Sequence, residues 1–355
     1  MDPGLEGVVA AATSLSMVDG QRGELIIAGF PVEELAPNAT FEQTVQLLWN
    51  ADLPDVSNRQ LPEIAHAILR AAAERGDDAM DALRAAAGVL LPEQLFPAFP
   101  TIVAAYWRLL HRQEPIAPRR DLSHAANYLY MLAGEMPSKE RVHALETYLN
   151  TVVDHGLNAS TFTARVITST GSDLVSAIVG AVGALKGPLH GGAPGPALDM
   201  VFEIGDASRA EKVLRRKIES GEKLMGFGHR VYKVRDPRAD VLAAAAERLY
   251  ARDGDMRLYE LARVVERTAI RLLQEYKPGR RLQTNVEFYT ALLLHGLGLE
   301  TPLFTPTFAI SRVAGWIAHC WEQRRTNRMI RPQSVYVGPR GRTWKTQPEP
   351  CPAVC

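Results

Sequence analysis

The chain of 355 residues has few cysteines, no excess of charge and no long apolar run. Its three cysteines, Cys320, Cys351 and Cys355, are too few for a disulfide framework, and no CxxC pair suggests zinc. Basic and acidic residues number 40 each, so the overall charge does not point to nucleic acid or an anionic membrane. The longest apolar run, within 174–185, is too short to span a bilayer, and the N-terminus lacks the pattern of a signal or transit peptide. We therefore expect a soluble cytoplasmic protein.

Strand signals are also scarce. Segment 14–30 contains an Asp19-Gly20 turn and predicts a small N-terminal hairpin. Alternating strand–helix units are absent, so a nucleotide-binding parallel sheet is not expected. Gly226-Phe227-Gly228 lacks the third glycine and the preceding strand of a dinucleotide fingerprint.

Helical patterns dominate instead. Thr40 and Gln43 predict a capping box for a helix that starts at Phe41. Apolar residues recur three or four apart, as on one helix face, through segments 138–153, 61–75, 239–252, 258–276 and 308–323. Segment 174–185 is apolar all round and rich in alanine and glycine, which predicts a central helix packed closely against others. The sequence predicts an all-α protein.

Four segments contain residues that could carry chemistry. They are 154–162 with His155, 186–196 with His190, 225–240 with His229 and several arginines, and 284–290 with Glu287. Glycines and prolines around His190 would hold its ring in one direction, as a general acid requires. Singly, His155 could cap a helix C-terminus, His190 and His229 could be structural turn residues, and Glu287 could be a salt-bridge partner. Together they suit proton abstraction beside a carbonyl, with guanidinium groups holding carboxylates.

Two other polar sets allow weaker conclusions. Positive charge gathers near the C-terminus, where over residues 322–345 a single acidic residue, Glu322, stands against seven basic ones: Arg324, Arg325, Arg328, Arg331, Arg340, Arg342 and Lys345. This excess predicts either a solvated helix end and tail or a site for an anionic ligand. The remaining histidines show no metal-ligand spacing and are expected to be surface or core residues: His66, His111, His124, His143, His295 and His319.

The segments GPLHGGA, GFGHRVYKVRDPR and NVEFY resemble the three catalytic segments of the citrate synthase family, in the family's order and spacing. The stretches GLEGVVAAATSLSMVDGQRGEL, PIAPRRDLSHAANYLYML, DHGLNASTF and RPQSVYVG also resemble its short bacterial and archaeal members, so the resemblance covers about residues 4 to 340. It implies an all-α homodimer, an acyltransferase that needs no metal or other cofactor. The implied reaction condenses acetyl-CoA with oxaloacetate and hydrolyses citryl-CoA to citrate and CoA.

The resemblance also implies a large domain and a smaller one that closes over substrate. On this chain, the large domain would comprise residues 1–190 and a return segment, 293–340. The small domain would comprise 191–292, and a tail, 341–355, would follow. The glycine–proline turn after Lys186 and the charged helical region at roughly 199–276 agree with these bounds, which predict hinges at both boundaries.

The family's catalytic roles carry over to three residues. The methyl group of a thioester is a very weak carbon acid, so its deprotonation needs a base and a simultaneous donor to the carbonyl oxygen. The resemblance implies that Glu287 is this base and His190 this donor. It implies that His229 protonates the carbonyl of oxaloacetate as the carbon–carbon bond forms.

Five further residues match ligand-binding positions of the family. His155, Arg238 and Arg312 match oxaloacetate ligands, and Arg331 matches an arginine that reaches the partner subunit's site. Lys233 falls where the family places a basic contact to the phosphates of CoA.

Glu287 departs from the family, which usually has aspartate in NVDFY. The added methylene would move the carboxylate by about 1 Å, and a misplacement of that size can cost roughly 10²-fold in rate. A slow enzyme, or one for a related substrate, is therefore expected. One alternative is a 2-methylcitrate synthase that uses propionyl-CoA, since one methylene in a pocket is worth only about 1–3 kcal/mol. Another is a non-catalytic paralogue that binds CoA or oxaloacetate.

Overall fold

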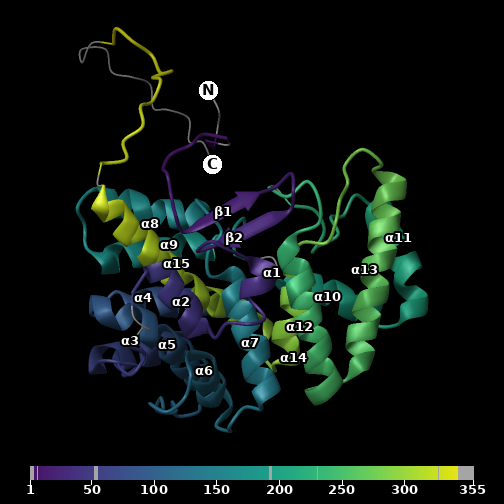
Figure 1. The fold of residues 1–355 in the computed structure, drawn as a ribbon, viewed down its shortest axis with the longest axis horizontal. Helices are drawn as coiled ribbons and strands as arrows, with labels where there is room; N and C mark the ends of the chain where they lie inside the picture. The colour runs from purple at the N-terminus through teal and green to yellow at the C-terminus, as the bar shows by residue number, and fades with distance from the viewer. Residues whose placement is uncertain are drawn as a thin grey trace.

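The computed structural model describes residues 4–5, 7–51, 55–191, 194–229, 231–326 and 328–342. Within these ranges the protein is built from α-helices and one small sheet (Figure 1), as predicted. No helix in them is both long and apolar enough to cross a membrane. Lys345, Cys351 and Cys355 lie outside the described residues.

The N-terminal hairpin forms as predicted. Strands β1 (Ser16–Asp19) and β2 (Glu24–Ile27) are antiparallel, with Ser16 opposite Ile27 and Asp19 opposite Glu24. The Asp19 carboxylate accepts hydrogen bonds from the backbone N–H groups of Gln21 and Arg22, which stabilises the turn. A two-residue strand that was not predicted, β3 (Phe30–Pro31), pairs with β2.

A larger group of helices surrounds α15 (Phe304–Arg325), which crosses the body in Figure 1. Helix α15 packs against α2, α4, α5, α7, α8 and α9. The predicted capping box is present, since Thr40 Oγ1 accepts from the backbone of Gln43 and the Gln43 side chain accepts from the backbone of Thr40. The other members of the group are α1 (Val32–Leu35), α2 (Phe41–Trp49), α3 (Glu63–Arg75), α4 (Ala79–Ala87), the 3-10 helix η1 (Pro92–Gln94), α5 (Leu95–Leu110), α6 (His124–Ala133), α7 (Lys139–Val152), α8 (Ala159–Ser169), α9 (Leu174–Lys186) and η3 (Thr301–Leu303).

The central helix is α15 and not, as predicted, the segment 174–185. That segment forms α9, but only one face of α9 is buried. Val175 and Val179, on its other side, remain partly exposed. An apolar composition therefore marked a well-packed helix correctly but did not distinguish a central position from a peripheral one.

A second group of helices lies to the right in Figure 1. It consists of α10 (Pro194–Ile204), η2 (Ala207–Arg209), α11 (Ala210–Glu219), α12 (Pro237–Asp253), α13 (Met256–Tyr276) and α14 (Val286–Gly296). Helices α12 and α14 pack against each other and against α7, which joins this group to the larger body. The predicted boundary at residue 191 lies in the turn before α10, and the one at 292 lies inside α14. A separate movement of residues 191–292 stays a prediction.

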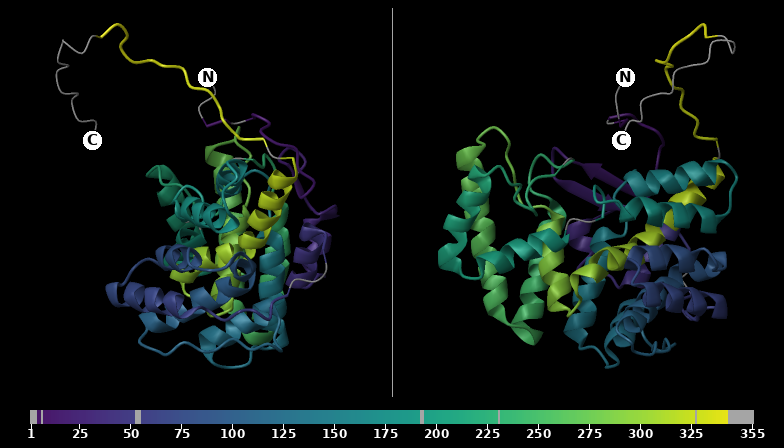
Figure 2. Two further views of the ribbon diagram at one scale, coloured as in Figure 1. Left: turned by 90° about the vertical axis from the view of Figure 1, so that its left-hand side faces the viewer. Right: turned by 180° about the vertical axis from the view of Figure 1, so that it is seen from behind.

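The described C-terminal segment, 328–342, has neither helix nor strand and runs away from the helical body (Figure 2). Three consecutive apolar side chains in it, Val335, Tyr336 and Val337, are 64%, 60% and 87% exposed. Within one subunit, these side chains therefore bury little of their apolar surface.

Candidate active site

Six of the eight predicted site residues line one cavity of about 440 Å³: His155, His190, His229, Arg238, Glu287 and Arg312. They come from the ends of α7 and α9, the loop before α12, the first turns of α12 and α14, and the middle of α15. A cavity of this size suits a small-molecule ligand. The tertiary structure therefore brings together segments that lie far apart in the sequence.

His190 lies on the turn that follows α9. Its backbone N–H donates to the carbonyl oxygen of Gly187 at 2.9 Å, which closes the turn. Gly191 follows, and a Cβ atom there would lie 2.5 Å from the carbonyl oxygen of Leu185. Glycine is needed at this position because the turn packs directly on the end of α9.

The His190 ring is fixed by Ser160 at the start of α8. The backbone N–H of Ser160 donates to His190 Nε2 at 3.3 Å, and Ser160 Oγ lies 2.8 Å from the same nitrogen. Because a backbone N–H can only donate, Nε2 accepts and the proton of the neutral ring sits on Nδ1. Burial, together with the charge of Arg312, lowers the pKa of His190 to about 4. At neutral pH the ring is thus an uncharged donor through Nδ1.

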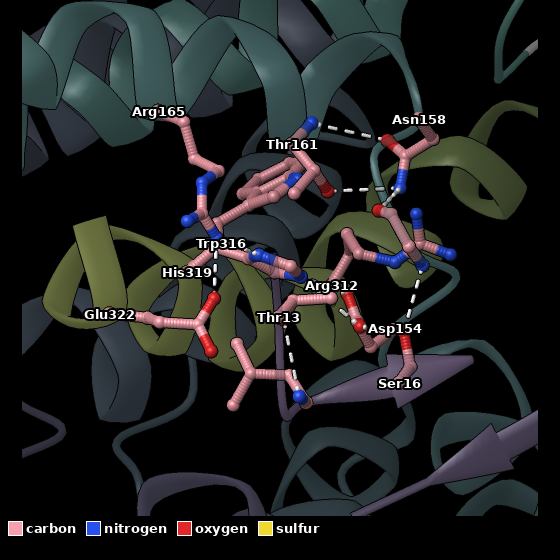
Figure 3. Close-up of polar contacts among 12 residues, drawn as sticks. Thr13, Ser16, Asp154, Asn158, Thr161, Arg165, Arg312, Trp316, His319 and Glu322 are labelled. Carbon is pink, nitrogen blue, oxygen red and sulfur yellow. Dashed lines mark hydrogen bonds and ion pairs between the residues drawn. The ribbon is translucent and has the colours of Figure 1, made fainter. Parts of the chain in front are cut away.

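Two neighbours in turn orient Ser160, namely Trp316 and Asn158, both of which are labelled in Figure 3. Trp316 Nε1 donates to Ser160 Oγ at 3.1 Å, and Ser160 Oγ lies 2.8 Å from Asn158 Oδ1, so the one hydroxyl proton of Ser160 is shared between His190 Nε2 and Asn158 Oδ1. Asn158 also caps α8 by accepting from the backbone N–H of Thr161. The N-terminus of α8 and one face of α15 together hold the ring of His190.

Backbone pairing brings His229 and Glu287 to the same cavity. Segments 226–228 and 283–285 form a short antiparallel bridge, in which the backbone N–H of Gly228 donates to Gln283 at 2.7 Å. Gly226 and Gly228 have φ values of +86° and +83°, which strongly favour glycine. The Gly-Phe-Gly sequence therefore shapes this pairing and not a nucleotide site.

The proton of His229 is fixed by its own loop. His229 Nδ1 accepts from the backbone N–H groups of Val231 and Tyr232, both at 3.1 Å, so the neutral ring carries its proton on Nε2. Arg238 Nη2 lies 3.4 Å from Nε2. Burial, and then the charge of Arg238, lowers the pKa of His229 to about 4. Two donors that face each other in this way suit an acceptor oxygen of a ligand between them.

The two cavity arginines differ in how their charge is balanced. Arg238 forms a double contact with Asp236, Nε to Oδ1 at 3.0 Å and Nη2 to Oδ2 at 2.8 Å. Arg312 is 1% exposed, donates from Nε to the carbonyl oxygen of Val152 at 2.7 Å and lies over the Phe308 ring. In the described part of the chain no carboxylate forms an ion pair with Arg312. A buried cation without a carboxylate partner favours an anionic ligand.

Glu287 lies in the first turn of α14, between Val286 and Phe288, which are both buried. Its backbone N–H donates to Asn285 Oδ1 at 3.0 Å, so Asn285 caps the helix. Burial raises the pKa of the Glu287 carboxyl to about 7, against the attraction of Arg238 and with the repulsion of Asp236. A carboxylate with this pKa is a stronger base than usual and is about half ionised at pH 7.

The other two predicted site residues lie outside this cavity. Lys233 lines an adjoining cavity of about 430 Å³, which shares Gly228 and His229 with the first. Arg331 is exposed on the C-terminal segment. In the described ranges, no group of three or more histidine, cysteine, aspartate or glutamate residues could hold a metal ion.

Sequence reasoning missed the supporting roles of Asp236, Trp316 and His319. Trp316 and His319 follow Arg312 by four and seven residues, so all three lie on one face of α15. A polar stripe at helical spacing in an otherwise apolar helix was the available signal. Asp236 gave a weaker one, as the residue before the proline that begins α12.

The comparisons with known proteins agree with this geometry. A family model described as citrate synthase, C-terminal domain, matches residues 4–333. The chain belongs to the citrate synthase family. Citrate synthase 2 of Bacillus subtilis is 40% identical over 366 residues, covering 95% of each chain. The 2-methylcitrate synthase of Mycobacterium tuberculosis H37Rv is 38% identical over 361 residues, covering 94% of this chain and 90% of its own.

Solved citrate synthase structures share the fold. The enzyme from Pyrobaculum aerophilum superposes with a TM-score of 0.88 at 35% identity, covering 97% of this chain and 94% of its own. Citrate synthase from the archaeon Thermoplasma acidophilum, in a ternary complex with carboxymethyl coenzyme A and oxaloacetate, gives 0.87 at 30% identity, covering 97% and 98%. The predicted family, all-α fold and acyltransferase class are confirmed, whereas the individual residue roles stay predictions.

Proposed function

We propose that the chain is a citrate synthase, which condenses acetyl-CoA with oxaloacetate and hydrolyses citryl-CoA to citrate and CoA. The observation that carries the proposal is the meeting of Glu287, His190 and His229 in one cavity with two buried arginines. The protonation states suit the chemistry, because the base has a raised pKa and both histidines are neutral donors. The names of the relatives, and the oxaloacetate complex of the Thermoplasma enzyme, support the same substrates.

The proposed mechanism divides proton transfer between three residues. Glu287 takes a proton from the thioester methyl group while His190 Nδ1–H donates to the thioester oxygen, so an enol forms without a free carbanion. His229 Nε2–H then donates to the carbonyl oxygen of oxaloacetate as the new carbon–carbon bond forms. A positioned acid or base of this kind typically contributes about 10² to 10⁴ in rate.

Oxaloacetate would be held by Arg238, Arg312 and His155. Two guanidinium groups match the two carboxylates of this substrate. Burial, followed by the charges of Arg238 and Arg312, lowers the pKa of His155 well below its ordinary value, so its ring is neutral. His155 Nε2 lies 3.1 Å from the Tyr232 hydroxyl, and this contact fixes the orientation of the His155 ring, which lines the cavity.

Lys233 would contact the phosphates of CoA. The adjoining cavity that Lys233 lines also includes Arg280 and Arg281, so three basic side chains surround it. Because this cavity shares Gly228 and His229 with the first, an acyl-CoA could lie across both, with its thioester beside Glu287.

We further propose a homodimer in which Arg331 reaches the partner subunit's cavity. Arg331 lies on a segment that runs away from its own body, near the exposed side chains of Val335, Tyr336 and Val337. Helix α9 also leaves part of an apolar face accessible. Burial of such surfaces against a second copy would be favourable.

The proposal includes a small domain, residues 191–292, that closes over substrate against 1–190 and 293–340. Closure would exclude water from a reaction that passes through an enol. It also includes the absence of a metal or other cofactor, since Glu287, His190 and His229 provide the acid–base groups that the reaction needs. A cytoplasmic location stays a prediction.

The test is the oxaloacetate-dependent release of free thiol, measured with acetyl-CoA and propionyl-CoA in parallel. We expect release with both, and a higher kcat/KM for acetyl-CoA. A preference for propionyl-CoA above about tenfold, the discrimination that one methylene can give, would identify a 2-methylcitrate synthase, the second candidate favoured by the mycobacterial relative. No release from either thioester would identify a non-catalytic paralogue.

A further inference from the structure

A chain of polar contacts crosses the core behind the cavity (Figure 3). Glu322 Oε2 accepts from Arg165 Nη1 at 2.7 Å, and Arg165 Nη1 donates to His319 Nδ1 at 2.8 Å. His319 Nε2 lies 3.1 and 3.2 Å from the two carboxylate oxygens of Asp154. Asp154 Oδ2 accepts from Ser16 Oγ at 2.5 Å. We name Asp154, His319, Arg165 and Glu322 the buried relay.

The proton positions in the buried relay follow from Arg165, which donates to His319 on the side away from Asp154. Arginine has only donors, so His319 Nδ1 accepts and Nε2 carries the ring proton. His319 therefore donates to Asp154, whose carboxylate accepts from His319 and Ser16. Burial by itself raises the pKa of Asp154, but His319, the charge of Arg312 and the bond from Ser16 lower it below its ordinary value. Asp154 thus stays ionised in the core.

Stability alone does not explain such a chain. Asp154 and His319 are 0% exposed and Arg165 is 3% exposed. Buried ionic groups give little net stability, because their desolvation offsets their attraction, and apolar replacements of similar volume are often as stable. Groups of this kind are retained in some proteins because they fix one arrangement of the chain, and the surroundings of Asp154 point to that role here.

The inner end of the relay holds the backbone on both sides of His155. Asp154 precedes His155, and Ser16 Oγ, which donates to Asp154, also accepts from the backbone N–H of Gly156 at 2.9 Å. Gly156 has a φ of +58°, so the chain turns sharply just after His155. Through Ser16, the relay therefore fixes the residues on both sides of His155, which lines the cavity.

Helix α15 packs directly on this turn. A Cβ atom at Gly315 would lie 2.3 Å from the carbonyl oxygen of Val153 and 3.2 Å from Asp154 Oδ1. His319 is one helical turn further along α15, on the same side. The close approach lets the His319 ring reach the carboxylate.

We propose that the buried relay positions His155 for oxaloacetate binding, with Asp154, His319, Arg165 and Glu322 as positioning residues that do not touch substrate. The inference rests on the proposed role of His155 as an oxaloacetate ligand. It assigns a function to His319 and Arg165, which lie behind the cavity wall. Loss of His319 would leave Asp154 with one partner fewer and free the turn at His155 to shift.

The test compares two substitutions of His319. In His319→Gln the amide oxygen can accept from Arg165 while the amide N–H donates to Asp154, whereas His319→Leu can do neither. We expect His319→Leu to weaken oxaloacetate binding, measured by calorimetry, about 10- to 100-fold, the usual worth of one hydrogen bond to a charged group, which a displaced His155 would no longer make. The KM for acyl-CoA, and kcat at saturating oxaloacetate, should change less than about threefold. His319→Gln should recover most of the affinity.

His124→Leu is the matched control. His124 is also 0% exposed and stacks on Phe96 with ring centroids 4.6 Å apart, and neither of its ring nitrogens has a hydrogen-bond partner among the described residues. Because His124 lies away from the cavity lining, His124→Leu should leave oxaloacetate affinity unchanged, whatever its effect on Tm. A purely structural role for His319 would give the same result for His319→Leu.

Each outcome decides the matter. Unchanged oxaloacetate affinity in a folded His319→Leu protein overturns the positioning role. If His319→Leu does not fold, Ser16→Ala removes only the hydrogen bonds that Ser16 makes with Asp154 and Gly156. An unchanged oxaloacetate affinity in that variant likewise overturns the positioning role. If the wild-type protein itself binds no oxaloacetate, the proposed function fails, and the positioning role fails with it.

Discussion

Glu287 stands where the resemblance to the family leads us to expect aspartate, and its surroundings are set by the first turn of α14. Asn285 fixes the backbone of the first turn of α14, and Val286 and Phe288 are buried on either side. Glu287 lines the same cavity as His190 and His229. The raised pKa of Glu287 follows from this burial and would apply to an aspartate as well, so the length of the side chain is the variable to test.

We expect Glu287→Asp to lower kcat by about 10- to 100-fold, because a carboxylate withdrawn by one methylene no longer reaches the methyl proton from this backbone. Steady-state kinetics with saturating oxaloacetate would measure the change. A rise in kcat would show that the local backbone still suits aspartate.

The pH dependence follows from the same residue. The pKa of Glu287 is raised to about 7, and the base must be ionised, so kcat/KM should rise about tenfold per pH unit below 7 and level off above it. His190 and His229, with pKa values of about 4, stay neutral over this range and should cause no further change in kcat/KM. A flat profile between pH 5.5 and about 7 would contradict the assignment of the base.

At the level of elements, the bridge between segments 226–228 and 283–285 sets the distance between acid and base. Gly226 has a φ of +86°, and a Cβ atom there would lie 2.9 Å from Phe288 Cβ. Gly226→Ala should therefore displace α14 from the His229 loop and lower kcat/KM about 10- to 100-fold. Gly221→Ala is the matched control, since Gly221 has a φ of +82° but no atom near its Cβ position. Equal losses of activity in the two variants would attribute the effect to strain alone.

The sequence predicted local elements better than their packing. The capping box at Thr40 and the hairpin at Asp19-Gly20 depend on neighbouring residues, and both formed as predicted. The central position of α15 and the bridge at 226–228 depend on residues far away in the chain, for which no local pattern exists. His319 was expected only as a surface or core residue, because its partners Asp154 and Arg165 lie more than 150 positions away.

At the level of the whole molecule, the proposed site is complete only in a dimer. A mixture of Arg331→Ala and His229→Ala subunits should recover activity that neither variant has alone, since each hybrid contains one complete cavity. Random pairing would give about a quarter of wild-type activity, because half of the dimers are hybrids with one working site in two. Hybrids as inactive as both parents would show that Arg331 does not act across the interface.

The measurement that bears most directly on the proposed mechanism pairs binding with turnover in Glu287→Gln. The amide fills the same volume but cannot accept the methyl proton, and Arg238, Arg312 and His155 remain in place to hold oxaloacetate. Calorimetry should show oxaloacetate affinity close to wild type, and thiol release from acetyl-CoA should fall by about 10² or more, the contribution of one positioned base. Tm at pH 8 should be no lower than wild type, because ionisation of Glu287 lowers stability progressively from its ordinary pKa of 4.5 up to about 7, and this cost, which glutamine avoids, is complete at pH 8. Glu287→Gln with near wild-type thiol release would contradict the mechanism.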